Sequence, residues 1–332
     1  MVNQKKLVDE VSGWLRVYDD GSVDRTWTGP PEVKFMVEPV PAHVEFINGV
    51  AVRDTVTNNN LRVRLYLPEK VSNEEKLPIF LHFHGGGFCI SEPDWFMYYQ
   101  FYSQLARLAR VIVVSCFLRR APENRLPAAI DDGFSALLWL QDVAGRETEE
   151  PWLEKHGDFR RVFLIGDSSG ANIVHEVAAR AGKTQLKLIS VAGGIPIHPG
   201  MMRSTRSRSE LEKPQSPFLT LDMVDKFMSL ALPLGSTKDH PIACPMGDSA
   251  PPLSGLKLPP FLLCLAELDL IFDTEMEYYE AMRMANKDVE LYVNEGVTHS
   301  FYLNKIAVDM DPNTGAQTHA LMARIKQFIE EH

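Results

Sequence analysis

The 332-residue sequence predicts an α/β protein with a mostly parallel central sheet and helices on both faces. The first observation is that short runs of β-branched and apolar residues alternate along the chain with longer amphipathic segments. The second is the composition, 45% hydrophobic and 23% charged, which is typical of a chain that buries a large core. Because no repeat or long linker divides the chain, we expect a single domain over residues 1–332.

The part of the chain before residue 90 predicts one helix and several strands. The helix is expected over residues 5–17, and the strands over 23–25, 50–56, 61–67 and 77–83. The turn-prone run Asn58-Asn59-Asn60 joins the second and third of these strands into a pair. Leu77–Phe83 is apolar throughout but too short for a helix, so it predicts a buried central strand.

From residue 98 onward the predicted strands and helices alternate. The strands are 111–116, 161–165, 186–195, 261–265 and 289–293, and the helices are 98–109, 126–140, 171–181, 221–232, 273–285 and 316–331. Between residues 200 and 234 the alternation lapses into a polar loop and one helix. In such a sheet an excursion of this kind lies over the carboxyl ends of the strands, where ligands bind. Residues 200–235 are therefore expected to contribute a small helical lid.

The charge of the chain argues against several classes of partner. The formal net charge is −10 at pH 7, whereas nucleic acid or an anionic membrane requires clustered Lys and Arg. No stretch reaches the ~18 apolar residues of a membrane span, and no apolar signal core follows the N-terminal lysines. We therefore expect neither a nucleic-acid nor a membrane partner.

The cysteines indicate a reducing compartment. Cys89, Cys116, Cys244 and Cys264 are scattered, and two of them lie in apolar strand-like runs where a free thiol behaves as a small hydrophobe. The chain also lacks an Asn-x-Ser/Thr sequon, one sign of a secretory route. A cytoplasmic or nuclear location is expected.

Gly166-x-Ser168-x-Gly170 follows a predicted buried strand and precedes a predicted helix. This is the nucleophile-elbow pattern, in which a serine occupies a strained strand-to-helix turn and flanking glycines let the two backbones approach closely. The pattern also occurs by chance in loops, so it needs support from other residues. It makes Ser168 the candidate nucleophile.

Support comes from His84-Gly85-Gly86-Gly87, which follows the preceding central strand. A glycine run lets backbone N–H groups point into a cavity, and each such donor stabilises the oxyanion of acyl transfer by about 2.7 to 4 kcal/mol. A phosphate-binding loop would need a Lys-Ser/Thr ending, which is absent. We assign His84 to holding the loop.

Asp269 follows a predicted strand, and His299 follows the last predicted strand. The chain order Ser168, Asp269, His299 is the order in which strands of this type of sheet supply a nucleophile, an acid and a base. Glu267 and Asp273 compete for the role of the acid. Asp269 is preferred because Glu267 would project differently and Asp273 resembles the start of a helix.

Other histidines compete for the role of the base, among them His175 on the elbow helix and His198 in a loop. A single histidine is more often structural than catalytic. His299 is preferred because the loop after the last strand can bring its imidazole to the serine. The predicted chemistry is two-step acyl transfer: His299 deprotonates Ser168, Asp269 orients the imidazole, and water then cleaves the acyl-enzyme.

Together these motifs resemble the plant carboxylesterase family, within the hormone-sensitive-lipase group of α/β-hydrolases. The matching pieces span most of the chain: His84-Gly-Gly-Gly-Phe88, Ala121-Pro-Glu-Asn-Arg-Leu-Pro-Ala-Ala129, Gly166-Asp-Ser-Ser-Gly-Ala-Asn-Ile173, Asp269 and His299. The N-terminal segments Val11–Val17 and Asp20–Arg25 are most similar to the branch of tobacco hypersensitivity-related carboxylesterases.

This resemblance implies an α/β-hydrolase fold and activity on short acyl esters of small hydrophobic compounds, without a cofactor or a metal. By analogy with the family, the oxyanion donors are the N–H groups of Gly86, Gly87 and Ser169. The resemblance also implies that the N-terminal segment, about residues 1–30, helps to form the lid.

The chain departs from the family pattern at Phe117-Leu-Arg-Arg-Ala-Pro-Glu-Asn124, where Asp-Tyr-Arg-Leu-Ala-Pro-Glu-His is usual. Arg119 and Glu123 are retained, so an ion pair between them is expected. Whether Arg119 and Arg120 face the pocket, where they would favour an acidic substrate, or pack beneath it stays open.

The substrate pocket is expected to be apolar. Its candidate residues are Gly85, Phe88, Trp95 and Phe218, followed by Phe96, Met223 and Phe227, and each of the apolar ones is as consistent with plain core. Two other functions remain open. A lyase, dehydratase or cyclase would use the same base and oxyanion loop without an acyl-enzyme, and a hormone receptor would only bind. We expect a monomer or a homodimer.

Overall fold

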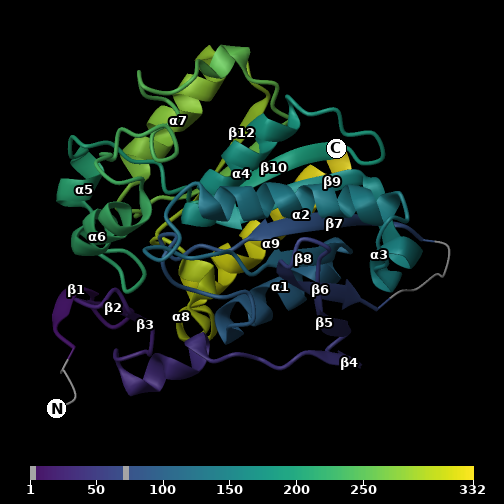
Figure 1. The fold of residues 1–332 in the computed structure, drawn as a ribbon, viewed down its shortest axis with the longest axis horizontal. Helices are drawn as coiled ribbons and strands as arrows, with labels where there is room; N and C mark the ends of the chain where they lie inside the picture. Colours follow the sequence, from purple (N-terminus) through teal and green to yellow (C-terminus); the bar gives the residue numbers. More distant parts are fainter. Residues whose placement is uncertain (1–4, 70–74) are drawn as a thin grey trace.

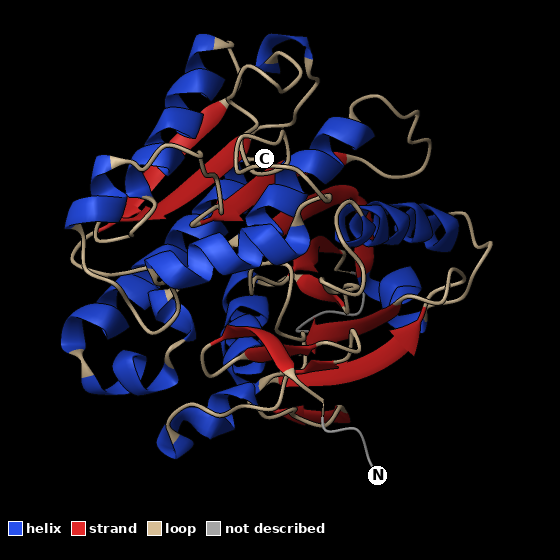
Figure 2. Ribbon diagram, turned by 60° about the vertical axis from the view of Figure 1, so that its left-hand side comes forward, coloured by secondary structure: helices blue, strands red, loops and turns tan. Residues whose placement is uncertain are grey.

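The computed structural model describes residues 5–69 and 75–332, and a nine-stranded sheet runs through the part of the chain that it describes (Figures 1 and 2). From one edge to the other, the strands are β12 (Val289–Asn294), β11 (Phe261–Ala266), β10 (Val191–Ile197), β9 (Gly157–Asp167), β7 (Leu77–Phe83), β8 (Ile112–Cys116), β6 (Arg62–Pro68), β5 (Val50–Val56) and β4 (His43–Ile47). The strands from β12 to β8 are parallel, and β6, β5 and β4 continue the sheet in antiparallel pairs. The predicted mostly parallel sheet is confirmed.

Helices pack on both faces of the sheet, as predicted (Figure 2). One face carries α2 (Ala128–Ala144), α4 (Ser169–Ala181) and α7 (Phe272–Met284), and the other carries α1 (Phe96–Ala109) and α9 (Pro312–Glu331). Shorter helices are α3 (Pro151–His156), α5 (Arg208–Glu212), α6 (Leu221–Ala231) and α8 (Lys305–Met310), with 3-10 turns at Pro31–Val37, Leu253–Gly255 and Phe301–Leu303.

The alternation of side chains along the central strands divides the apolar core into two layers. In β7, Ile79 and Leu81 pack toward α2 and α4, whereas Phe80 between them packs toward α1 and α9. All seven residues of β7 are buried, because both faces of this strand are covered. This two-sided burial explains why the sequence of a central parallel strand reads as one continuous apolar run.

The predicted helix over residues 5–17 is wrong. These residues form two strands of a small antiparallel sheet, β1 (Leu7–Val11) and β2 (Leu15–Tyr18), joined to β3 (Val23–Asp24). Gly13 has φ +79° in the turn, and the turn places Val11 opposite Leu15, so that both are buried. A spacing of four residues suits one face of a helix, but it also results when a tight hairpin turn separates two facing residues.

The remaining differences lie at element boundaries and in short elements. β10 begins at Val191, so residues 186–190 of the predicted strand precede it, and α9 begins at Pro312, four residues before the predicted helix. The edge strand β4 and the short helices α3, α5 and α8 were not predicted. Within the described ranges no helix is long and apolar enough to cross a membrane.

Candidate active site

Ser168 lies in the sharp turn between β9 and α4, at the carboxyl end of a central strand. Its backbone has φ +50° and ψ −122°, a conformation that residues with a side chain rarely adopt. The turn is possible because the neighbouring elements approach closely: a Cβ on Gly170 would lie 2.0 Å from the carbonyl oxygen of Phe83. The strained turn places Ser168 in the lining of a cavity, with its hydroxyl beside His299.

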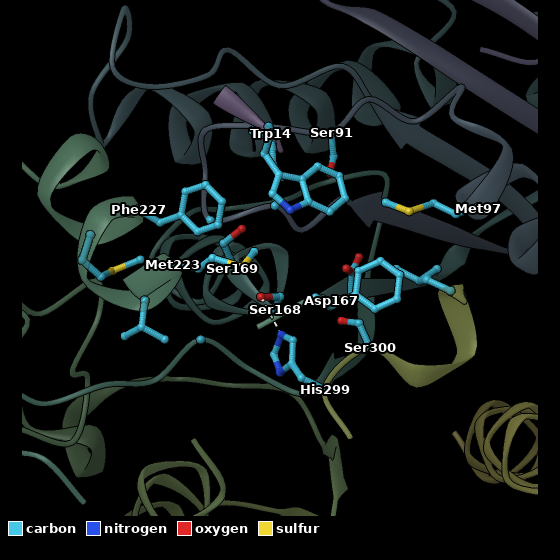
Figure 3. A pocket seen from close by; sticks show the side chains of 18 of the residues that line it. Trp14, Ser91, Met97, Asp167, Ser168, Ser169, Met223, Phe227, His299 and Ser300 are labelled. Carbon is cyan, nitrogen blue, oxygen red and sulfur yellow. Dashed lines mark hydrogen bonds between the residues drawn. The ribbon is translucent and has the colours of Figure 1, made fainter. Parts of the chain in front are cut away.

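The structure brings Ser168, His299 and Asp269 together in one chain of hydrogen bonds. Figure 3 shows the contact between Ser168 and His299. His299 Nε2 lies 2.9 Å from Ser168 Oγ, and His299 Nδ1 donates to Asp269 Oδ2 at 2.6 Å. The other carboxylate oxygen of Asp269 accepts the backbone N–H of Ile271 at 3.1 Å. Loops after β11 and β12 supply the acid and the imidazole, since the carboxyl ends of parallel strands meet at one edge.

The competing acids and bases have other partners. Glu267 accepts the backbone N–H of Gly296, and Asp273 accepts that of Ser209. His175 is paired with the hydroxyl of Tyr278 at 2.8 Å.

Burial shapes the electrostatics of the Asp269–His299 pair. The side chain of Asp269 is fully buried and that of His299 is 3% exposed. Burial alone would raise the pKa of the Asp269 carboxyl, but the charge and hydrogen bond of His299 outweigh it and lower that pKa below its usual value. Asp269 is therefore an anion that is available to stabilise an imidazolium.

The glycine loop lies directly beside the serine. Gly86 and Gly87 have φ +97° and +58°, and neither backbone N–H donates to an acceptor among the described residues. Ser169 is the first residue of α4, where a backbone N–H has no partner within the helix. The N–H of Gly85 instead donates to Asp167 and to the hydroxyl of Tyr98, at 3.1 Å each, so this residue anchors the loop from behind.

An apolar cavity opens over these groups (Figure 3). The space around these residues that no atom fills, including space open to solvent, is about 590 Å³. Of the residues predicted for the pocket, Phe218, Met223 and Phe227 line it. The predicted residues Gly85, Phe88, Trp95 and Phe96 lie outside its lining.

Two of the aromatic residues that lie outside the lining make structural contacts instead. Phe88 has φ +63°, donates its backbone N–H to Ser169 Oγ, and packs its ring into the core. Trp95 stacks on Trp14 with ring centroids 6.3 Å apart. Trp14 itself, in the turn of the N-terminal hairpin, lines the cavity, and the sequence had not singled it out. Its position follows from a contact between segments about 80 residues apart.

The expected Arg119–Glu123 ion pair is not formed. Arg119 pairs with Asp132 at 2.8 Å, whereas Glu123 binds the guanidinium of Arg25 from the N-terminal segment. Arg120 pairs with Glu92 at 2.7 Å. Neither Arg119 nor Arg120 lines the cavity, so the possibility that they select an acidic substrate is not supported.

His198, Asp269 and His299 form the one group of three metal-type ligands that lies close together in the described chain, with ligand atoms within 4.8 Å of one another. The Asp269 carboxylate and both nitrogens of His299 are already engaged in the hydrogen bonds of the serine site. A metal ion there would have to break that chain, so the donor set does not fit a metal centre.

Residues 80–303 match the protein family described as "alpha/beta hydrolase fold". A probable carboxylesterase 6 from Arabidopsis thaliana is 35% identical, with 90% of this chain and 85% of that protein aligned. A 2-hydroxyisoflavanone dehydratase from Glycyrrhiza echinata is 35% identical over 98% of this chain and 97% of its own. The gibberellin receptor GID1C of A. thaliana is 34% identical over 89% and 85%.

Among solved structures, carboxyl esterase 2 from the mycorrhizal fungus Tuber melanosporum is similar with a TM-score of 0.70. It covers 90% of this chain and 94% of its own at 20% identity, so this likeness supports the fold alone.

The chain belongs to the plant carboxylesterase family of the α/β-hydrolases. The family, the fold and the enzyme class predicted from the sequence, a carboxylic ester hydrolase, are confirmed at this level. The likeness to the tobacco hypersensitivity-related branch stays a prediction.

Proposed function

We propose that this protein is a serine carboxylesterase that hydrolyses short acyl esters of small hydrophobic plant metabolites through an acyl-enzyme. The observation that carries the proposal is the hydrogen-bonded chain from Ser168 through His299 to Asp269. This chain adjoins an apolar cavity and backbone N–H groups that have no acceptor among residues 5–69 and 75–332.

In this mechanism His299 Nε2 takes the proton of Ser168 as Oγ attacks the ester carbonyl carbon. The carbonyl π electrons move to oxygen, and the tetrahedral intermediate collapses when imidazolium returns the proton to the leaving alkoxide. Water, deprotonated by His299, then attacks the acyl-serine, and the proton passes back to Ser168 Oγ as the acid leaves. Asp269 stays ionised throughout and holds the imidazole in the tautomer with Nδ1 protonated.

The negative charge that develops on the carbonyl oxygen must be stabilised by hydrogen-bond donors close to Ser168. The N–H groups of Gly86, Gly87 and Ser169 form the proposed oxyanion hole, because they lie beside Ser168 and none donates to an acceptor in the described part of the chain that would compete. Their positions are held from behind by the bonds of Gly85 to Asp167 and Tyr98.

The proposed substrate class follows from the lining of the cavity. Trp14, Met223 and Phe227 give it apolar walls, and the described lining contains no Lys or Arg that would hold an anionic substrate. The β1–β3 hairpin and helix α6 supply part of these walls and touch each other through β1 and α6 (Figure 1). We infer that residues 5–30 and 200–235 act as the lid; residues 1–4 lie outside the described part. A cytoplasmic or nuclear location and a monomer or homodimer complete the proposal.

A second candidate function is elimination or cyclisation on a specialised metabolite, and the 2-hydroxyisoflavanone dehydratase among the relatives favours it. His299 would then remove a proton from carbon, and the oxyanion donors would stabilise the enolate. A pure receptor, as in the gibberellin receptor relative, is disfavoured because His299 is present and bonded to Ser168.

The test is hydrolysis of p-nitrophenyl esters from acetate to octanoate by the wild type and by Ser168→Ala. The proposal expects fast turnover of the short esters and a loss of at least about 10³-fold in kcat in the variant. Covalent labelling by a fluorophosphonate with negligible ester turnover would favour the elimination or cyclisation function. If the protein showed neither labelling nor turnover, the receptor function would be favoured.

A further inference from the structure

His198 is a fully buried histidine beside the serine site, in the loop that follows β10. Its backbone has φ +45°, a region that residues with a side chain seldom occupy. Its backbone N–H donates to the carbonyl of Cys264 in β11 at 2.8 Å. The fold therefore holds this residue in a backbone conformation that is strained for a side chain.

The two ring nitrogens of His198 have different roles. The backbone N–H of Ser300 lies 2.9 Å from Nδ1, and because a backbone amide can only donate, Nδ1 is the acceptor. A neutral ring then carries its proton on Nε2. Nε2 is buried and has no hydrogen-bond partner among the described residues.

The ring lies against the Asp269–His299 pair. One nitrogen of His198 is within 4.8 Å of both an Asp269 oxygen and a His299 nitrogen, and the two imidazole centroids are 5.7 Å apart. Burial lowers the pKa of His198 to about 3, and this outweighs the attraction of the Asp269 carboxylate. The other titratable groups nearby are Asp167 and Tyr302.

We propose that His198 is a positioning residue of the serine site. Its Nδ1 holds the backbone directly after His299, and its uncharged ring does not compete with His299 for the Asp269 carboxylate. The inference rests on the proposed function, because it assigns His198 a role in the same acyl transfer.

The first part of the role is mechanical. Ser300 has φ +51° and adjoins the base, so a bond to its N–H restrains the turn that carries the His299 ring. A misplacement of about 1 Å in a catalytic group can cost about 10²-fold in rate. The second part is electrostatic, since a cation at position 198 would compete with the imidazolium of His299 for the Asp269 carboxylate.

Two substitutions test the role of the Nδ1 acceptor separately from that of the ring's bulk. His198→Phe keeps the ring and removes the acceptor, whereas His198→Asn keeps an acceptor near Nδ1 and tolerates φ +45°. On a p-nitrophenyl ester that the wild type hydrolyses, we expect His198→Phe to lower kcat by about 10- to 100-fold with KM within about 2-fold. We also expect it to move the acidic limb of the kcat/KM profile to lower pH, because a looser Asp269–His299 contact stabilises the imidazolium less. His198→Asn should recover kcat to within about 5-fold of the wild type.

The matched control is Tyr302→Phe. The Tyr302 ring also packs against His198, with centroids 5.8 Å apart, and its buried hydroxyl has no partner among the described residues. This variant changes the packing around His198 without touching its nitrogens, so kcat and the pH profile should match the wild type.

If His198→Phe fails to fold, ¹⁵N NMR of histidine-labelled wild type keeps the inference testable, with His198→Asn assigning the signal. The inference expects a neutral ring protonated at Nε2 that does not titrate between pH 5 and 8. A proton on Nδ1, titration within that range, a folded His198→Phe with unchanged kcat and pH profile, or equal losses in His198→Phe and His198→Asn would each overturn it. An inactive wild type would instead reject the proposed function itself.

Discussion

Asp269 receives its role from its contacts rather than from its residue type, because Glu267 and Asp273 are also carboxylates close in sequence. Only Asp269 meets His299, at 2.6 Å, and it is fully buried with the backbone N–H of Ile271 as its other donor. Removing its charge while keeping its shape should leave the imidazole unsupported when it becomes a cation.

We therefore expect Asp269→Asn to lower kcat by about 10³-fold or more, with KM changed by less than about 3-fold. The matched control is Glu267→Gln, which alters the neighbouring carboxylate that bonds to the N–H of Gly296. Steady-state kinetics on a short p-nitrophenyl ester measure both variants. A Glu267→Gln loss as large as that of Asp269→Asn would show that the acid has been misassigned.

Residues of the site that belong to a local motif could be predicted from the sequence. Ser168 is marked by its glycines, and His299 and Asp269 by their places after strands. The roles of Trp14 and His198 could not be predicted: the sequence offers His198 only as a competing base, and no local pattern indicates that Trp14 lines the cavity. Trp14 reaches the cavity only through the docking of the N-terminal hairpin, and His198 is recognisable only from its bond to Ser300.

At the level of elements, the N-terminal hairpin is attached to the rest of the molecule by Arg25. Its guanidinium binds both carboxylate oxygens of Glu123 and donates to the carbonyls of Cys89 and Ala121. One of these four contacts ties the hairpin that carries Trp14 to Cys89, just after the oxyanion glycines, and the other three tie it to Ala121 and Glu123 in the loop after β8. A loss of this attachment should loosen one wall of the cavity and leave the serine site intact.

Arg25→Ala is accordingly expected to raise KM by about 3- to 10-fold for apolar esters, while kcat stays within about 2-fold. Lys5→Ala is the matched control, because Lys5 lies just before β1 and its contacts with Asp20 and Ser22 are exposed. The measurement is KM and kcat across the acyl series. Identical kinetics for the two variants would contradict the anchoring role of Arg25.

Helix α6 forms the facing wall through Phe227. Its ring packs so closely on the oxyanion loop that a Cβ on Gly87 would lie 2.2 Å from it. Phe227→Ala should open the wall and shift the preferred acyl chain to greater length by about two carbons or more, as expected for removal of a buried aromatic ring. Leu234 lies in the same segment, residues 200–235, and is 83% exposed, so Leu234→Ala should leave the acyl-chain preference unchanged. If Phe227→Ala kept the acyl-chain preference of the wild type, the acyl chain would not bind against Phe227.

The elements of the sheet were predictable because each central strand is a buried run bounded by turn residues. The N-terminal hairpin was not, because Val11 and Leu15 are spaced as on a helix and only the turn at Gly13 decides between the two structures. Short helices such as α3 and α5 depend on caps and tertiary contacts, which periodicity does not register.

At the level of the whole molecule, buried neutral histidines link stability to pH. Burial lowers the pKa of His84 and His175 to about 4 and that of His198 to about 3, and it also lowers the pKa of His82. In the unfolded chain these groups take up protons near pH 6.5. Their contribution to stability is therefore complete above about pH 6.5 and is lost as the pH falls toward 4 to 3, by at most about 1.4 kcal/mol per pH unit for each histidine.

We expect the free energy of unfolding to fall steeply between pH 6.5 and 4 in denaturant titrations. His175→Gln should flatten this dependence by about one proton, because His175 pairs with Tyr278 away from the serine site. A pH dependence identical to that of the wild type would show that His175 is not held neutral by the fold.

The central claim is that Ser168 forms the covalent intermediate, and intact-mass and peptide analysis of the enzyme after a fluorophosphonate and after a rapidly quenched p-nitrophenyl ester tests it most directly. The account predicts one adduct per chain, located on the peptide that contains Ser168 and absent from Ser168→Ala. Ester turnover with no adduct on Ser168, or with an adduct on another residue, would contradict it.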